Sequence, residues 1–416
     1  MNNNFDYDCI IIGGGPAGLL ASLKACEKGG RIAVVERNNI LGKKLRITGK
    51  GRCNITNACD FDTLMANIPG NSKFMFSAFR NFSNHDIIEY FNSLGLETVV
   101  ERGERVFPKS QRAGDVAGVL VSAVKKTENI ELLMNTYVKD ILINDGSVCG
   151  IVANDGTQDF TLNSSCIICA TGGCSYPLTG STGDGYRFAQ KAGHSIVKPK
   201  ASLAALISKD SFMNDLSGLS LKNISIKMKI NNNIVYEDFG EMLFTGKGVS
   251  GPVILSASAY YKENSNCTIS IDLKPALDED KLYARLQRDF DEFDRKIYSN
   301  SLDKILPKKL IPVFVKRSGI LPTKQVNQLN KEERMAIVYL LKNFTVNIHD
   351  IDDIKNAIVT AGGVNIKEIN PKTMESKLCK GLYFAGEVID VDGYTGGFNL
   401  TIAFSTGYAA GQNINI

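Results

Sequence analysis

Residues 7–18 read Tyr-Asp-Cys-Ile-Ile-Ile-Gly-Gly-Gly-Pro-Ala-Gly, and this stretch decides the fold. Its isoleucine-rich first half is typical of a short parallel strand that is buried on both faces. Residues 19–28 then have helical composition, until Gly29 and Gly30 end the pattern. Residues 31–36 form a second apolar run, so the segment predicts one βαβ unit.

The glycine spacing matches the GxGxxG pattern of dinucleotide-binding proteins. Gly13 permits the tight turn, Gly15 lets the backbone approach a pyrophosphate, and Gly18 lets the helix pack closely. Free N–H groups at the start of the helix would bind the phosphates. Glu36 ends the second strand, where an acidic side chain accepts hydrogen bonds from ribose hydroxyls. These features predict a dinucleotide site.

Two distant segments favour FAD over NAD as the dinucleotide. Residues 165–170 form another predicted buried strand, which ends in Thr171-Gly172-Gly173 and is expected to lie beside the first. Residues 382–387 form a strand ending in Gly386-Glu387, and residues 396–399 then open an apolar helix. The N-terminus of that helix would face the flavin edge where reduction places negative charge. No second GxGxxG follows a strand, so NAD(P)H would dock only transiently, as the reductant.

The composition limits the class of protein further. The chain has 416 residues and a net charge of +4, with 44% apolar and 22% charged residues, which fits a soluble protein of two or three domains. Its ten cysteines are irregularly spaced, and the first six residues do not resemble a signal peptide. No run of 18 apolar residues occurs. We therefore expect a reduced, cytoplasmic protein that does not span a membrane.

The residue pattern changes near residues 195, 275 and 342. Alternating apolar and polar residues at 224–230, followed by strand-like residues at 234–237 and 267–273, predict an antiparallel sheet or small barrel. Residues 275–342 lack strand signals and favour helices, and residues 381–385 return to the buried-strand pattern. One α/β domain interrupted by an insertion explains these changes.

Several motifs, spread over almost the whole chain, are together specific for one family. They are Gly49-Lys50-Gly51-Arg52-Cys53-Asn54-Ile55-Thr56-Asn57, Arg105-Val106-Phe107-Pro108, Gly240-Glu241-Met242-Leu243-Phe244-Thr245, Val249-Ser250-Gly251-Pro252, Thr360-Ala361-Gly362-Gly363-Val364, Thr373-Met374-Glu375-Ser376, and residues 383–387 with 396–399. On these residues the chain resembles the BaiN/RdsA-type (YhiN-like) NAD(P)/FAD-dependent flavoproteins. It departs from them at Phe398, where the family has Tyr, and at Thr401, where it has Gln.

The resemblance implies a discontinuous Rossmann-like FAD-binding domain with an inserted β-barrel, which itself carries a helical insertion. The expected boundaries are 1–194 with 350–416 for the FAD domain, 195–274 with 336–349 for the barrel, and 275–335 for the helical insert. Members of the family are linked to reduction of bile-acid enones, reduction of a uridine in large-subunit ribosomal RNA, and amine oxidation. The residues expected to bind FAD are Gly13, Gly15, Pro16, Ala17, Gly18, Glu36, Arg37, Lys43, Lys44, Gly51, Arg52, Cys53, Asn54, Thr171, Gly172, Gly173, Gly386, Glu387, Gly396, Gly397, Phe398 and Asn399.

Cys53 is the candidate catalytic residue. An enone and a uracil ring both present an alkene conjugated to a carbonyl, so their reduction needs a hydride, a donor to the carbonyl oxygen and one proton source. We expect Cys53 to be that source, with Arg52 favouring its thiolate form. The alternatives are that Cys53 only packs in a loop built around FAD, or that it forms a redox pair with Cys59.

The other cysteines and the histidines do not indicate a catalytic or metal site. Cys166 and Cys169 fit a buried strand. The three histidines are far apart and lack ligand spacing, so we expect solvated or structural roles for them and no metal. They are His85, His194 and His349.

Two segments carry most of the excess positive charge. Residues 37–59 hold six basic residues and no acid, which the two phosphates of FAD explain. Residues 295–331 hold nine basic residues and one acid, Asp303, in the predicted helical insert, where FAD explains nothing. This second segment is either a solvated helical face or a surface that binds an RNA backbone. The candidate RNA-binding residues are Lys308, Lys309, Lys316 and Arg317.

The leading hypothesis is an FAD-dependent oxidoreductase that uses NAD(P)H to reduce a conjugated C=C bond. The basic insert favours a uridine of large-subunit ribosomal RNA as its substrate, which would give dihydrouridine. Small enones, such as steroid-like or bile-acid-like compounds, are the next candidates. A flavin amine oxidase and a non-catalytic, flavin-dependent RNA-binding factor are the remaining alternatives.

Overall fold

The computed structural model describes residues 5–293 and 295–415, and the chain divides into two compact units. The first unit comprises Met1–Ser202 and Ile354–Ile416, and the second comprises Leu203–Asp353. Each unit has its own hydrophobic core. The segment that lacks signal-peptide features overlaps residues 1–4, which lie outside the described residues.

A five-stranded parallel sheet forms the centre of the first unit, in the order β20-β10-β1-β2-β6. Its strands are β1 (Cys9–Ile12), β2 (Ile32–Glu36), β6 (Ile130–Met134), β10 (Ile167–Cys169) and β20 (Leu382–Phe384). As predicted, the isoleucine-rich run is buried, and β10 pairs with β1, with Ile168 beside Ile11. The α/β, Rossmann-like fold is therefore confirmed.

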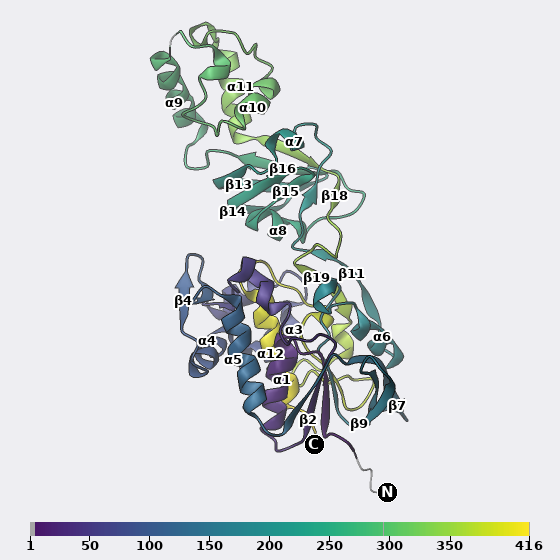
Figure 1. The fold of residues 1–416 in the computed structure, drawn as a ribbon. Helices are drawn as coiled ribbons and strands as arrows, with labels where there is room; N and C mark the ends of the chain where they lie inside the picture. Colours follow the sequence, from purple (N-terminus) through teal and green to yellow (C-terminus); the bar gives the residue numbers. More distant parts are fainter. Residues whose placement is uncertain (1–4, 294, 416) are drawn as a thin grey trace. The chain divides into compact units, whose positions relative to one another are not determined.

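The last helix packs on the first. Figure 1 shows α1 (Pro16–Cys26), α5 (Ala113–Lys126) and α12 (Phe398–Gln412) side by side in the first unit. A Cβ at Gly407 would lie 2.3 Å from Ala17 O, and one at Gly411 would lie 2.3 Å from Ala21 O. The close approach of α12 to α1 thus requires glycine, and it brings the C-terminal segment to the GxGxxG turn.

Smaller elements complete the first unit. β11 and β19 form a two-stranded sheet. Two further sheets have three strands each, in the orders β3-β5-β4 and β7-β8-β9. The strands are β3 (Thr56–Asn57), β4 (Thr98–Glu101), β5 (Arg105–Pro108), β7 (Tyr137–Asn144), β8 (Ser147–Asn154), β9 (Asp159–Asn163), β11 (Ile196–Ser202) and β19 (Val359–Val364). The helices are α2 (Phe61–Ala66), α3 (Ser72–Asn81), α4 (Asn84–Ser93) and α6 (Asp184–Lys191), with short 3₁₀ turns at η1 (Leu45–Gly51), η2 (Pro177–Thr179), η5 (Ile366–Glu368) and η6 (Gly386–Val388).

The second unit is built on a seven-stranded antiparallel sheet in the order β17-β16-β13-β14-β15-β12-β18. The first and last strands in this order, β17 (Phe344–Ile348) and β18 (Asp350–Ile351), are joined by the single residue His349. The sheet therefore curls until its two ends meet, as a barrel does. The other strands are β12 (Leu206–Ile207), β13 (Ser220–Ile230), β14 (Asn233–Thr245), β15 (Gly248–Ser250) and β16 (Cys267–Asp272).

Helices follow β16 and precede β17, as the absence of strand signals in residues 275–342 predicts. They are α9 (Glu279–Glu292), α10 (Ile311–Ser318) and α11 (Lys331–Lys342), with turns η3 (Tyr298–Asn300) and η4 (Val326–Gln328); α7 (Met213–Leu216) and α8 (Pro252–Ser258) lie earlier in the unit. The finer division of the chain at residues 194/195, 274/275, 335/336 and 349/350 stays a prediction.

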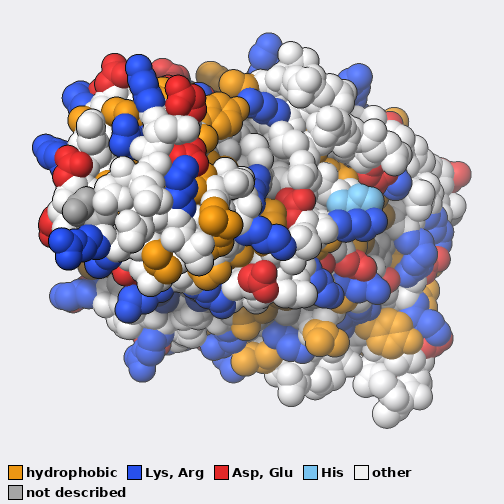
Figure 2. All heavy atoms as spheres, turned by 90° about the horizontal axis from the view of Figure 1, so that it is seen from above, with side chains coloured by type: hydrophobic (Ala, Val, Ile, Leu, Met, Phe, Trp, Pro, Cys, Tyr) orange, Lys and Arg blue, Asp and Glu red, His pale blue; other side chains and the backbone are white. Residues whose placement is uncertain are grey.

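The surface is mixed in charge. Figure 2 shows Lys and Arg side chains across the visible face, with Asp and Glu side chains between them. Within residues 5–293 and 295–415, no helix is long and apolar enough to cross a membrane.

Candidate functional site

The glycines of the first βα turn serve different purposes, and only Gly15 borders free space. A Cβ at Gly13 would lie 2.5 Å from Ala170 O, and one at Gly18 would lie 1.9 Å from Gly13 O. These two glycines are therefore required by the fold itself. A Cβ at Gly15 would meet no protein atom within 4 Å, and the first turn of α1 carries no acidic residue. The turn leaves a cradle in which a phosphate can approach the backbone.

Glu36 braces this cradle from the end of β2. It is 8% exposed, and its Oε2 accepts a hydrogen bond from Gly14 N at 2.8 Å. Its Oε1 accepts from Asn38 N at 2.8 Å and from Asn38 Nδ2 at 2.6 Å. Lys43 Nζ donates to Asn38 Oδ1 at 3.0 Å, so Asn38 links two predicted site residues. No spacing pattern around residue 38 marks Asn38 as a site residue.

The side chains of Arg37 and Lys44 form ion pairs with different parts of the first unit. Arg37 forms an ion pair with Asp184 at 2.9 Å and donates to Thr182 Oγ1 at 2.6 Å. Lys44 Nζ instead forms an ion pair with Glu387 Oε2 at 2.8 Å, across 343 residues of sequence. Lys44 thereby joins the glycine-rich loop to the end of β20.

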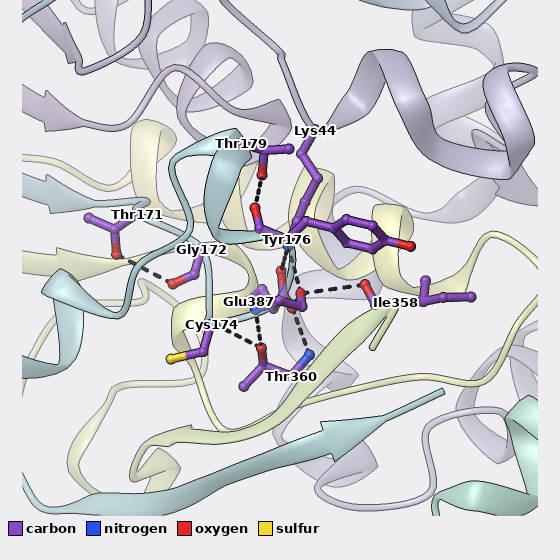
Figure 3. A network of polar contacts seen from close by, with 10 residues as sticks. Lys44, Thr171, Gly172, Cys174, Tyr176, Thr179, Ile358, Thr360 and Glu387 are labelled. Atoms are coloured by element: carbon purple, nitrogen blue, oxygen red, sulfur yellow. Dashed lines mark hydrogen bonds and ion pairs between the residues drawn. The ribbon is translucent and has the colours of Figure 1, made fainter. Parts of the chain in front are cut away.

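Glu387 is the centre of a polar network (Figure 3). Its Oε1 accepts hydrogen bonds from Ser175 Oγ at 2.9 Å and from Thr360 N at 2.7 Å. Burial alone would raise the pKa of Glu387, but Lys44 and these hydrogen bonds outweigh it and hold the pKa below its usual value. Ser175 and Thr360 were missed from the sequence, because nothing local marks residues whose partners are so distant.

The Thr171-Gly172-Gly173 turn lies directly against this network. A Cβ at Gly173 would be 2.5 Å from Thr360 Oγ1 and 3.2 Å from Glu387 Oε1. Cys174 N donates to Thr360 Oγ1 at 2.8 Å. The turns that follow β10 and β20 are thus brought together, because these two strands are neighbours in one parallel sheet.

The start of α12 meets the loop that holds Cys53 and Asn54. A Cβ at Gly397 would be 2.5 Å from Thr56 O, and Thr56 Oγ1 lies 2.7 Å from Thr401 Oγ1. Asn399 Nδ2 donates to Gly393 O at 2.7 Å. Thr401, which departs from the family pattern, therefore has a partner of its own in this chain.

Asn54 supplies an acceptor with no protein donor. Its Oδ1 is buried and has no hydrogen-bond partner among the described residues. A buried polar atom without a partner is costly, so its presence indicates a missing donor. Together with the open space at Gly15, this fits a bound cofactor with hydrogen-bond donors and phosphates, such as FAD.

Cys53 is a buried neutral thiol. It is 0% exposed, and burial raises the pKa of the Cys53 thiol to about 12, although a hydrogen bond with Thr48 opposes the rise. The expectation that Arg52 favours a thiolate here is wrong. The Arg52 guanidinium forms an ion pair with Glu101 and lies 4.1 Å from the Phe107 ring centroid, so its charge is engaged elsewhere. Cys53 and Cys59 are both free thiols.

The four candidate RNA-binding residues lie in the second unit and differ in their surroundings. Lys308 and Lys316 are exposed. Lys309 Nζ donates to Ser217 O, and Arg317 donates to Thr345 O at 2.6 Å with its guanidinium 4.4 Å from the Phe344 ring centroid. Lys309 and Arg317 therefore each make a structural hydrogen bond within the second unit.

The His194 side chain is buried and forms hydrogen bonds within the fold. Its Nε2 lies 2.7 Å from Ser376 Oγ and its Nδ1 lies 3.2 Å from Glu368 Oε2, in a buried position. This arrangement resembles a hydrolytic triad, but Ser376 Oγ already accepts from Leu378 N and Cys379 N. Among the described residues, no group of three or more His, Cys, Asp or Glu is placed to hold a metal ion.

Comparison with known proteins decides the family. The model of the HI0933-like protein Rossmann domain matches residues 7–413. The chain belongs to the HI0933-like family. The family predicted from the motifs is therefore confirmed, and this member of the HI0933-like family is an oxidoreductase, as the sequence also predicted.

Several relatives match nearly the whole length of this HI0933-like protein. The 3-dehydro-bile acid delta(4,6)-reductase of Clostridium scindens is 29% identical and the match covers 97% of each chain. The ribosomal RNA dihydrouridine synthase of Escherichia coli is 28% identical over 98% of each. Among solved structures, the 3-ketosteroid-delta4-(5alpha)-dehydrogenase of Rhodococcus jostii matches 99% of this chain and 98% of its own, with a TM-score of 0.53 and 15% identity. This last likeness supports the fold alone.

Proposed function

We propose that the chain binds FAD and uses NAD(P)H to reduce a C=C bond conjugated to a carbonyl, and that its substrate is a uridine of large-subunit ribosomal RNA. Two observations carry the proposal: the turn at Gly15 borders free space, and the buried Asn54 Oδ1 has no hydrogen-bond donor among the described residues. The two relatives support the reaction class, because both names describe the reduction of a carbon–carbon double bond beside a carbonyl.

Bound FAD would supply the hydride that is added to the carbon β to the carbonyl. The chain's own residues would hold the cofactor in four places. The N–H groups at the start of α1 would bind the phosphates, and Glu36 would accept hydrogen bonds from the ribose hydroxyls. Glu387, fixed by Lys44 and Ser175, would accept hydrogen bonds from the ribityl hydroxyls of FAD. The N-terminus of α12 would favour negative charge on the flavin ring.

The basic helical segment favours an RNA over a small enone as substrate. Lys304 pairs with Glu292 and Lys324 with Glu333, so these two charges are compensated. Other basic side chains of the segment are exposed, and a phosphate backbone is the partner that such a surface fits. They are Arg295, Lys296, Lys308, Lys309, Lys316 and Lys331, of which Lys309 also donates to Ser217 O. The proposal keeps the expected cytoplasmic location, where ribosomal RNA is found.

Reversing the charges of Lys308 and Lys316 together is expected to weaken binding of a ribosomal RNA fragment by about 10-fold and to reduce the salt dependence of binding by about two units of slope, one for each lysine. Both lysines are exposed, so the fold should be unaffected. The measurement is a binding titration at several salt concentrations.

A matched control is the same double charge reversal at Lys125 and Lys126, which are exposed at the end of α5. It changes the net charge equally and should leave RNA affinity close to the wild-type value. Equal weakening by both pairs would contradict a specific role for the helical segment.

A second candidate function is reduction of a small enone, which the Clostridium scindens relative favours. Deleting the gene in its host and mapping dihydrouridine in ribosomal RNA by mass spectrometry separates the two. Loss of one dihydrouridine is the expected result. An unchanged pattern of dihydrouridine would contradict ribosomal RNA as the substrate. Turnover of an enone by the purified protein would then favour the second candidate.

Two alternatives differ in what the purified protein would do. An amine oxidase would oxidise an amine with dioxygen, and a non-catalytic factor would bind RNA without turnover.

A further inference from the structure

Helix α11 carries an exposed aromatic side chain that neither the fold nor the cofactor site explains. Tyr339 is 65% exposed, whereas Phe76 and Phe239 are each 49% exposed. Among the described residues, no hydrogen bond or ring contact involves the Tyr339 side chain; only its backbone oxygen has a partner, Asn343 Nδ2 at 3.3 Å. A single exposed tyrosine is common on protein surfaces, so its surroundings decide whether it can bind a partner.

Tyr339 lies in a row with Met335 and Lys331 on the outer face of α11. These three residues are spaced four apart, which places them one above another along a helix over about 12 Å. All three are exposed, while the opposite face of the helix packs into the core of the second unit. The buried residues of that face are Ile337, Val338 and Leu341. The α11 row (Lys331, Met335 and Tyr339) therefore presents a cation, a flexible thioether and an aromatic ring to solvent.

The charges on α11 favour an anionic partner for this row. Lys331 forms no ion pair among the described residues. The carboxylate of Glu333 pairs with Lys324 at 2.6 Å and accepts from Asn330 N at 2.9 Å, so it does not compensate Lys331. Glu332 is exposed, but it lies about 100° around the helix from Lys331. The Lys331 charge is thus free to bind a phosphate.

The α11 row also belongs to the basic part of the second unit. α10 packs against α11, and its last turn carries Lys316 and Arg317 (Figure 1). The exposed ring of Phe239 in the same unit has the opposite setting. It lies on β14 between Glu237 and Glu241, which are exposed on the same face of the strand. Carboxylates on both sides would repel a phosphate backbone, so Phe239 is a matched control for Tyr339.

We propose that the α11 row binds a single-stranded segment of RNA, with the Tyr339 ring stacked on a base and Lys331 against a phosphate. The inference rests on the proposed RNA substrate and adds a contact that reads the bases as well as the backbone. Every base has a flat face, so stacking on Tyr339 gives affinity without selecting a sequence. Bases are available for such stacking in unpaired segments, and a uridine that is to be reduced must also leave its stack.

Tyr339→Ala is expected to weaken binding of an unstructured RNA oligonucleotide to the full-length protein by about 10-fold, the contribution of one stacked base. The salt dependence of binding should stay the same, because stacking releases no counterions, whereas Lys331→Gln should reduce the slope by about one unit. Tyr339→Phe keeps the ring and should bind within about 2-fold of wild type. A fully paired RNA duplex should bind Tyr339→Ala and wild type alike. Titrations at several salt concentrations measure all four results.

A fluorescence experiment tests the stacking itself. The chain has no tryptophan, so Tyr339→Trp introduces a single indole at the site. Its emission should be lost when the unstructured RNA is added, because a stacked base quenches indole fluorescence. Polyphosphate, which has the charge but no bases, should not quench it. Phe239→Trp is the matched control and should keep its emission in the same RNA.

Two results would overturn the proposal while leaving the proposed function in place, provided that the wild-type protein still forms dihydrouridine. One is wild-type affinity of Tyr339→Ala for the unstructured RNA, which is also the result expected if the α11 row serves a protein partner. The other is equal quenching at positions 339 and 239. Failure of the wild-type protein to bind or reduce RNA would overturn the proposed function, and this contact with it.

Discussion

Replacing Gly15 with alanine is expected to weaken FAD binding by about 100-fold, which is about 2.7 kcal/mol, without destabilising the FAD-free protein. The backbone at Gly15 has φ −82° and ψ −176°, a conformation that alanine adopts freely. The added methyl group would meet no protein atom within 4 Å. Only a ligand pressed against the turn would meet it. Alanine should therefore stabilise the apoprotein by about 0.5 kcal/mol, because it reduces the conformational entropy of the unfolded chain.

The matched control is Gly18→Ala in the same turn. Its methyl carbon would lie 1.9 Å from Gly13 O, so α1 would have to move away from β1. We expect a loss of about 2 kcal/mol in stability, seen as a lower thermal midpoint even without FAD. Calorimetric titration with FAD and thermal unfolding of the apoprotein separate the two effects. Wild-type FAD affinity in Gly15→Ala would mean that the ligand does not approach this turn.

Removing the charge of Glu387 is expected to have the second largest effect. Glu387→Gln would leave Lys44 largely buried without its partner, which costs about 3 kcal/mol, and it should lower the urea midpoint of the first unit at neutral pH. Because the pKa of Glu387 is lowered in the folded state, its contribution to stability is present above the unfolded glutamate pKa. That contribution is lost as the pH falls through the lower, folded value.

The expected result is therefore a gap in urea midpoint between wild type and Glu387→Gln that is widest at neutral pH and narrows below about pH 4.5, near the ordinary glutamate pKa. Glu97→Gln is a suitable control, because the side chains of Glu97 and its partner Lys109 are 73% and 67% exposed. That variant should differ little from wild type at any pH. A gap for Glu387→Gln that does not change with pH would contradict the assigned ion pair.

The sequence predicted those parts of the site that obey local rules. The GxGxxG spacing, the end of β2 at Glu36 and the glycine turns after β10 and β20 are each encoded within a few residues. Parallel strands then bring their carboxyl ends to one edge, which explains why these separate turns meet. The interruption of the α/β unit by an insertion was visible as changes of pattern along the chain.

What the sequence did not reveal depends on contacts across long separations. Ser175 and Thr360 meet at Glu387, and Asn38 bonds to Glu36 through geometry that no motif records. Charge counts also could not show that Arg317 packs on aromatic rings. Arg52 illustrates the same limit, since adjacency in sequence suggested an effect on Cys53, whereas its guanidinium lies against Phe107.

The most direct test of the account is an anaerobic two-step mixing experiment on the FAD-loaded protein. NAD(P)H first bleaches the flavin absorbance, excess reductant is removed, and unmodified ribosomal RNA is then added. The account predicts that the absorbance returns as dihydrouridine forms, with one uridine reduced for each flavin reoxidised. A flavin that stays reduced in the presence of RNA and of a conjugated enone, and is reoxidised only by dioxygen, would contradict it.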